Sequence, residues 1–208
     1  MRAMEAKIAA GLIADRLAAY DFTGRSGDIP LRMPTPDLRR AAVLMPLVWR
    51  EEGPTVLLTR RNDNLSTHPG QVSFPGGKVD GDDESAIMAA LREAREETGL
   101  DAARVSVLGT LPDYATITGY LVTPVVGLVT PPLALSPEPA EVAEVFEVPL
   151  PLLLDTSAYQ RHDYERDGMR GQYLALDWRH YTIWGATAAM LWLLADALKP
   201  WVWHQGES

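Results

Sequence analysis

Three glutamates, Glu93, Glu96 and Glu97, lie within about one and a half turns of a segment whose spacing predicts a helix. At about 100° per residue they share one face of that helix. Like charges at this spacing repel and cost an isolated helix a few tenths of a kcal/mol per pair. A bound Mg²⁺ or Mn²⁺ would cancel the repulsion, because these cations prefer carboxylate oxygens. The plainer alternative is a solvated face on which Arg92 pairs with Glu96, a contact of similarly small energy.

Two adjacent glycines, Gly76 and Gly77, precede this helix in the stretch FPGG. Glycine lets the backbone approach a ligand closely, so a carbonyl of either residue could give a metal ion a further oxygen. A tight turn explains the same pair, and the glycines taken alone favour that explanation. Their position shortly before the carboxylates favours a metal site.

The segment from Gly77 to Leu100 resembles a Nudix box, the signature of hydrolases that cleave a nucleoside diphosphate linked to another moiety. The residues that carry the resemblance are Gly77, Asp83, Arg92, Glu93, Ala94, Glu96, Glu97, Gly99 and Leu100. The second half of the pattern matches closely. The first half departs from the commonest form, because one extra residue lies before Arg92. Asp83, or Glu84 if the gap is placed earlier, stands in the first half where the family's glutamate is usual.

The longer stretch from Leu57 to Leu100 is similar to the coenzyme A diphosphatase branch of that family, which has the same extra residue. The matching residues of its lead-in are Leu57, Leu58, Thr59, Arg61, Leu65, His68, Gly70, Gln71, Phe74, Pro75, Gly76, Gly77, Lys78, Asp80 and Asp83. Asn62 stands where serine is usual. The resemblance covers about residues 41–150 and returns in IWGATAAML near the C-terminus.

This resemblance implies a metal-dependent enzyme that cuts the diphosphate of coenzyme A or its thioesters. The products would be 3′,5′-ADP and 4′-phosphopantetheine or its acyl form. It implies Mg²⁺ or Mn²⁺ as the cofactor, with Glu93 and Glu97 as the principal ligands. Glu96 and the carbonyl of Gly77 would be additional ligands. Arg92 would pair with a ligand carboxylate and set its orientation, and an ordinary surface ion pair is the alternative for it.

The general base in such enzymes is commonly a glutamate outside the box. Glu138, Glu141 and Glu144 are the candidates, in the loop and strand-like run that follow the Pro-rich segment TPPLALSPEPAE. We favour Glu141, because it stands where that loop enters the run VAEVFEV. Each of the three also fits a solvated position, and Glu96 is an alternative base.

Four residues outside the helix are candidates for substrate binding. Arg60 and Arg61 follow a strand-like run and are suited to phosphates, although one exposed and one structural arginine is an equally good explanation. His68 fits a contact to the nucleotide or a cap for the following turn, and the turn is slightly favoured. Lys78 belongs to the matched lead-in.

Two other functions fit the same sequence. The first is the same fold and chemistry on another substrate, such as ADP-ribose, a dinucleotide or a nucleoside triphosphate. The second is a non-catalytic module that senses a nucleotide. A sensor would be expected to lose box carboxylates, and this chain keeps Glu93, Glu96 and Glu97.

The elements that must position these residues follow from periodicity. Strand-like runs cover 40–50, 55–61, 71–74, 104–111, 120–129 and 142–150, and a polar hairpin over 159–178 turns near Asp167-Gly168. Helices are predicted over Met4–Tyr20, over about 83–98 with a stop at Gly99, and over 182–198. The first of them has Ile8, Leu12, Ile13, Leu17 and Ala18 on one side. Thr116 and Thr118 could donate hydrogen bonds from their hydroxyls, but a plain strand position is the favoured explanation for both.

Strands interrupted by single helices predict a mixed sheet flanked by helices. With the resemblance, this gives a Nudix α/β/α sandwich with a mixed β-sheet between helices. We divide the chain into an N-terminal helix and Gly/Pro-rich connector (1–37), the Nudix hydrolase domain (38–200) and a C-terminal tail (201–208).

Composition narrows the function classes. The chain has 208 residues, of which 47% are apolar and 23% charged, a composition typical of globular proteins. It has no cysteine, which excludes thiolate nucleophiles, disulfides and cysteine-ligated metals. A net charge of −9 disfavours nucleic-acid binding but not a phosphorylated small substrate, because a bound cation reverses the local field. No membrane span or targeting signal is evident, so we expect a cytoplasmic protein.

Four tryptophans lie near the C-terminus: Trp184, Trp192, Trp201 and Trp203. An aromatic binding surface is one explanation, but on an apolar helix the core or an oligomer interface is the better one. Trp201 and Trp203 follow a proline and are the pair more expected to be exposed. An exposed apolar patch there would indicate a homodimer.

Overall fold

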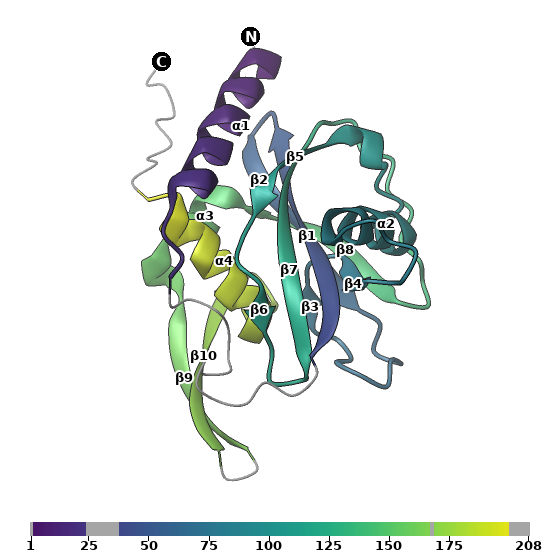
Figure 1. Cartoon of the computed structure of the whole chain (residues 1–208), viewed down its shortest axis with the longest axis vertical. Coiled ribbons are helices and arrows are strands. Elements are labelled where there is room, and N and C mark those ends of the chain that lie inside the picture. The colour runs from purple at the N-terminus through teal and green to yellow at the C-terminus, as the bar shows by residue number, and fades with distance from the viewer. Residues whose placement is uncertain (1, 24–37, 167–168, 200–208) are drawn as a thin grey trace.

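The computed structural model describes residues 2–23, 38–166 and 169–199 (Figure 1). Most of the predicted connector, the predicted turn at Asp167-Gly168, and both Trp201 and Trp203 lie outside these described residues. Within the described ranges, no helix combines the length and the apolar character needed to cross a lipid bilayer.

A mixed sheet forms the centre of the molecule, as predicted. Its strands are β1 (Arg39–Arg50), β2 (Gly53–Arg61), β3 (Val72–Ser73), β4 (Gly76–Lys78), β5 (Val105–Thr110), β6 (Tyr114–Ala115), β7 (Tyr120–Val129) and β8 (Val142–Pro149). Strand β1 pairs in parallel with β7 and antiparallel with β2 and β4. Strand β2 pairs antiparallel with β3 and β8, and β7 pairs antiparallel with β5 and β6.

Helices cover both faces of this sheet. Helix α2 (Ala86–Thr98) lies on one face, and α1 (Arg2–Ala19) and α4 (Gly185–Ala197) lie on the other (Figure 1). Short elements complete the fold: α3 (Leu150–Leu154) and the 3₁₀ turns η1 (Ala102–Arg104) and η2 (Thr156–Ala158). A second, three-stranded antiparallel sheet contains β9 (Gln160–Arg166), β10 (Met169–Trp178) and β11 (Tyr181–Trp184).

The two hydrophobic cores explain why β1 is apolar along almost its whole length. Successive side chains of a strand point to opposite faces, so Leu44 packs in the core under α2 while Met45 packs in the core under α1 and α4. A central strand covered on both faces has no solvent side and reads as a continuous apolar run. On the α2 side the helix contributes Ala89, Ala90 and Ala94, whose short side chains let it approach the sheet closely.

The first helix exists as predicted, but its buried face differs from the predicted one. Ile13 and Leu17 are buried in the core, whereas Ile8 and Leu12 are exposed. The buried stripe runs through Ala9, Ile13 and Leu17, and Ala18, which was predicted on this face, is exposed. Helical period alone shows which residues share a side, but contact with the sheet decides which side is buried.

The ends of the two other helices also differ from the prediction. Helix α2 begins at Ala86 rather than near Asp83, because Ser85 caps it by accepting a hydrogen bond from the N–H of Met88 at 3.2 Å. The closing helix begins at Gly185 rather than Thr182, because Tyr181–Trp184 pairs with β10 as strand β11. Strand β3 is shorter than the predicted run 71–74, and the short strands β4 and β6 were not predicted.

Candidate active site

Helix α2 presents its carboxylates from a well-defined frame. Its C-terminal end is fixed by Gly99 in the left-handed conformation (φ 74°), whose N–H donates to the carbonyl of Arg95, which confirms the predicted stop. The following loop docks on this end, since the N–H groups of Ser136 and Glu138 donate to the carbonyls of Thr98 and Glu97, each at 2.9 Å. The last turn of α2 is therefore held on two sides.

Glu97 is the most buried carboxylate of the three, with only 5% of the residue exposed. One of its oxygens accepts a hydrogen bond from the N–H of Gly76 at 3.0 Å. The pKa of Glu97 is raised to about 7, chiefly by burial and to a smaller extent by the charges of Glu141 and Glu93, against the opposing effects of the Gly76 bond and the Arg61 charge. A buried carboxylate this costly to ionise is the kind that a cation would stabilise.

Glu93 lies directly against the glycine pair. A Cβ added at Gly77 would sit 2.5 Å from the carboxyl carbon of Glu93, so any larger residue there would displace this carboxyl group. Burial raises the pKa of Glu93, and the hydrogen bond from Arg92 opposes that rise. Gly76, Gly77, Glu93 and Glu97 thus form one compact group, which we call the carboxylate site.

Glu96 occupies a different environment on the same helix. Its side chain is 59% exposed and accepts a hydrogen bond from Arg92 at 3.0 Å, the pair that the sequence predicted. The structure therefore places Glu93 and Glu97 in the carboxylate site and leaves Glu96 at the edge of that site.

Arg92 connects these groups. It donates to Asp83 at 2.9 and 3.1 Å, to Glu93 at 3.1 Å, to Glu96 at 3.0 Å and to the carbonyl of Lys78 at 3.1 Å. The hydrogen bond to Asp83 chiefly raises the pKa of Arg92, and the same bond chiefly lowers the pKa of Asp83. From the sequence, Asp83 had no predicted role beyond its place in the box pattern. Its position nine residues before Arg92 is set by the turn ahead of α2, which spacing along a helix does not reveal.

Of the three candidate bases, Glu141 is the one whose charge raises the pKa values of both Glu93 and Glu97. Its backbone is anchored beside the site, because its carbonyl accepts from the N–H of Asn62 at 2.9 Å. Glu138 is occupied locally and accepts from the N–H of Ala140 at 3.2 Å.

Glu144 points elsewhere, toward the start of the loop after β2. One of its carboxylate oxygens lies 3.9 Å from Nε of Arg60. Burial is the main cause of the raised pKa of Tyr181, and a hydrogen bond to Glu144 raises that pKa further. The arrangement therefore gathers Glu141, and not Glu144, with the helix carboxylates.

The two arginines at the end of β2 have different partners. Arg60 is engaged by Asp63 at 2.9 Å as well as by Glu144. Arg61 has a buried Nε with no hydrogen-bond partner, and its charge lowers the pKa of Glu97. A buried donor normally finds a partner, so Arg61 is the arginine with capacity left for an anionic ligand.

His68 and Lys78 lie at opposite ends of the loop and strand that carry the glycines. His68 sits in a turn with φ 54°, a left-handed conformation uncommon for residues other than glycine, and its carbonyl accepts from the N–H of Gln71 at 3.4 Å. Lys78 is exposed at the end of β4, where its carbonyl serves Arg92. His68 therefore lies in a turn, and both roles considered for its side chain, a cap for that turn and a contact to the nucleotide, stay predictions.

The donor set at the carboxylate site suits a hard divalent cation. Two observations carry this: the space beside Glu93 that a Cβ would fill, and the buried, uncompensated carboxylate of Glu97. Within the described residues, no group of three or more His, Asp or Glu side chains is placed so that it could hold a metal ion. Two carboxylates would suffice for Mg²⁺, because it commonly binds through one or two carboxylates and keeps several waters.

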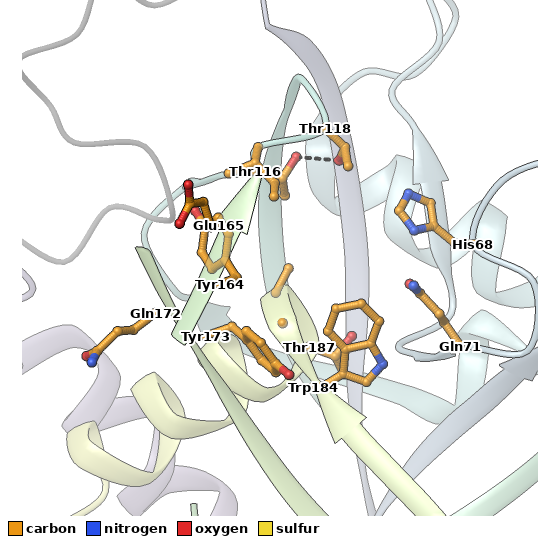
Figure 2. A pocket seen from close by; sticks show the side chains of 13 residues that line it. His68, Gln71, Thr116, Thr118, Tyr164, Glu165, Gln172, Tyr173, Trp184 and Thr187 are labelled. Carbon is orange, nitrogen blue, oxygen red and sulfur yellow. Dashed lines mark hydrogen bonds between the residues drawn. The ribbon is translucent and has the colours of Figure 1, made fainter. Parts of the chain in front are cut away.

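A cavity of about 310 Å³ lies near the start of the glycine-bearing loop (Figure 2). Its walls come from four parts of the chain: residues 68–71, the turn 116–118, strands β9 and β10, and the junction of β11 with α4. His68 belongs to this lining. Trp184, which the sequence placed in a helix core or an oligomer interface, is 42% exposed and lines the cavity instead.

Thr116 and Thr118 also differ from the favoured prediction. They belong to the turn between β6 and β7 rather than to a strand, their hydroxyls are 2.9 Å apart, and both line the cavity. Sequence reasoning missed Tyr164 and Tyr173 as lining residues. For Trp184 a signal was present, since the run YTIW is rich in the β-branched and aromatic residues that favour strands.

Comparison with known proteins supplies the family. The NUDIX domain model matches residues 38–165. The uncharacterized Nudix hydrolase NudL of Photorhabdus laumondii is 43% identical, over 88% of this chain and 99% of the relative. A NudL of Enterobacter sp. strain 638 is 46% identical, over 76% of this chain and 81% of the relative. Among solved structures, the Nudix hydrolase RenU from M. smegmatis is 29% identical and covers 64% of this chain and 76% of its own, with a TM-score of 0.47. The family model that spans more than half of the sequence, together with the two NudL relatives, shows that the chain belongs to the Nudix hydrolases.

Proposed function

We propose that this Nudix hydrolase cleaves the diphosphate bond of coenzyme A or acyl-coenzyme A with Mg²⁺ or Mn²⁺. The products are 3′,5′-ADP and 4′-phosphopantetheine or its acyl form. The family acts on nucleoside diphosphate derivatives, and the choice of coenzyme A is the specific part of the proposal.

One observation carries that choice: the lead-in that resembles the coenzyme A branch is built into the carboxylate site. Its strand β2 ends at Arg61, whose N–H donates to the carbonyl of Gln71 at 2.9 Å. Its glycines then reach α2, where the Gly76 N–H binds Glu97. Residues of the lead-in therefore flank the carboxylates and lie where a substrate's phosphates and its remaining groups would pass.

A divalent cation at this site would neutralise diphosphate oxygens and lower the pKa of a bound water. Glu93 and Glu97 would hold it, with the Gly77 carbonyl and Glu96 as further oxygens. Arg92 fixes the orientation of Glu93 through a direct hydrogen bond, and Asp83 fixes Arg92 in turn. The positive charge of Arg61, which already lowers the pKa of Glu97, would also attract a phosphate oxygen at this site.

Glu141 is the proposed general base. It accepts a proton from water as the water oxygen bonds to phosphorus, the bridging P–O bond breaks, and the bridging oxygen leaves with the other phosphate. Its electrostatic influence on both Glu93 and Glu97 supports this role over Glu138 and Glu144.

A substrate panel tests the proposal. Purified protein is incubated with coenzyme A, ADP-ribose, NADH and dGTP in Mg²⁺ or Mn²⁺, and products are separated by chromatography. We expect 3′,5′-ADP from coenzyme A at the highest kcat/KM, and no product when the metal is chelated. Turnover of ADP-ribose far above that of coenzyme A would overturn the substrate assignment but keep the chemistry. Binding without turnover of any compound would favour the nucleotide-sensing alternative.

A further inference from the structure

The cavity in Figure 2 is not used by the chemistry above, although it lies on the same loop as the glycines. Gln71, in its lining, stands five residues before Gly76, so their Cα atoms are at most roughly 18 Å apart. Thr187, at the start of α4, donates to the carbonyl of Val72 at 3.1 Å and ties this wall to β3. A substrate whose diphosphate lies at the carboxylate site can therefore reach the cavity with one of its two ends.

Aromatic rings in fixed positions form much of the cavity wall. Trp184 and Tyr173 meet edge to face with centroids 5.6 Å apart. Tyr164 lies opposite Gly171 in the β9–β10 ladder, and a Cβ at Gly171 would approach the Tyr164 ring to 2.7 Å. Glycine thus lets this ring lie close over the neighbouring strand. Such rings offer flat apolar surface without needing to be ordered when a ligand binds.

The polar groups of the wall are neutral hydrogen-bonding groups. The amide of Gln71 and the hydroxyl of Thr118 each supply both a donor and an acceptor. Among the described residues of the lining there is no lysine or arginine, and their one acidic member, Glu165, pairs with Arg170 at 3.0 Å. These described residues favour a neutral group over a phosphate as the occupant.

We infer that this cavity binds the adenine base of the substrate, stacked against Trp184 with its polar edge toward Gln71 and Thr118. The inference rests on the proposed function, since it takes the substrate to be a diphosphate with an adenosine half. A purine is flat, neutral and carries both donors and acceptors, which matches the rings and the polar edge together. The pantetheine arm has no flat ring, so it gains nothing from the stacking surfaces.

Inhibition by the two product halves tests this assignment. In Trp184→Ala, loss of stacking raises the inhibition constant of 3′,5′-ADP and the KM of coenzyme A about tenfold, because base stacking on an aromatic residue is usually worth at least that order. Binding lost equally from ground and transition states raises KM and leaves kcat within a factor of about two. The inhibition constant of 4′-phosphopantetheine stays within a factor of about two. Trp184→Phe restores most of the affinity for 3′,5′-ADP.

Tryptophan fluorescence gives a readout that needs no turnover. Titration with 5′-AMP in the absence of metal is expected to quench the tryptophan emission of the wild type. Trp184→Phe should abolish that quenching. Trp192→Phe, a matched control in α4 outside the cavity lining, should keep it. Circular dichroism melts show that each variant is folded.

The assignment is overturned if 5′-AMP quenches Trp184→Phe as strongly as wild type, or if Trp184→Ala weakens 4′-phosphopantetheine instead of 3′,5′-ADP. The second result would show that the cavity binds the pantetheine half of the substrate. If coenzyme A is not hydrolysed but the 5′-AMP quenching behaves as expected, the substrate proposal fails while the base site stands.

Discussion

The carboxylate site and the aromatic cavity are neighbours built in opposite ways. The first concentrates charge on one helix and a glycine pair, with Glu93 and Glu97 buried at an electrostatic cost. The second is neutral and assembled from four separate parts of the chain between residues 68 and 187. We therefore assign the reacting phosphates to the carboxylate site and a non-reacting neutral group to the aromatic cavity. Substitutions at the two sites should change different kinetic constants.

The largest effect is expected from Glu97→Gln. This change keeps the shape and an acceptor for the Gly76 N–H but removes the charge that holds the cation. We expect kcat for coenzyme A to fall at least a thousandfold, roughly 4 kcal/mol of transition-state stabilisation, with the fold retained. Glu96→Gln is the matched control on the same helix and should lose far less, because that side chain is largely exposed. A fully active Glu97→Gln enzyme would refute the metal assignment.

Gly77→Ala comes next. The added methyl group would meet the carboxyl group of Glu93 at 2.5 Å and must displace it. Activity should fall on the order of a hundredfold, in line with a misplaced catalytic group. Gly81→Ala, in the same connection but with open space around its Cβ, should behave as wild type. Equal kinetics for the two variants would show that contact with Glu93 is not needed.

Arg92→Lys should have a moderate effect. Lysine keeps the charge but cannot reproduce the fork that holds Asp83, Glu93 and Glu96 at once. Loss of a residue that orients ligands typically weakens metal binding or activity tenfold to a hundredfold, and we expect the lower end. Arg95→Lys, on the exposed side of the same helix, provides the control. The metal concentration at half-maximal rate is the quantity to compare.

The last prediction concerns the stability of the protein without metal rather than its activity. The pKa of Glu97 is about 7 in the folded protein against an ordinary value of 4.5, so the folded state holds the extra proton between these values. Stability of the metal-free protein should therefore fall as pH rises through this window, and the deficit should be complete above about pH 7. In EDTA at pH 8, Glu97→Gln should be more stable than wild type, by on the order of 3 kcal/mol at most, and at pH 5 the gain should shrink.

Urea unfolding at both pH values measures this difference. Saturating Mn²⁺ should remove or reverse it, because the cation stabilises the ionised carboxylate of the wild type. If Glu97→Gln is less stable than wild type at pH 8 without metal, burial of this charge is not the source of strain.

The same contrast explains what the sequence could predict. The carboxylate site depends on short-range spacing: glutamates one turn apart, a C-terminal glycine and an adjacent glycine pair. Helix α2, its stop at Gly99, and the pairing of Arg92 with Glu96 were therefore predictable. The mixed sheet followed from the alternation of strand-like runs with single helices.

The cavity depends on contacts that no local pattern contains. Trp184 was assigned to a helix because its surroundings are apolar, but pairing of β11 with β10 holds it in a strand and Gly185 (φ 63°) starts the helix after it. The buried face of α1 was likewise decided by its packing against the sheet. The role of Asp83 depends on a turn that returns it to Arg92. In each of these cases, a contact between distant parts of the chain decided the structure against the preference of the local sequence.

Manganese binding tests the central claim most directly, namely that Glu93 and Glu97 hold a divalent cation beside the glycine pair. Free Mn²⁺ is followed by electron paramagnetic resonance during titration of wild type, the Glu93→Gln/Glu97→Gln double variant and Trp184→Ala. The account predicts saturable binding by wild type and Trp184→Ala, and at least a hundredfold weaker binding by the double variant. Equal Mn²⁺ affinity in wild type and the double variant would contradict it.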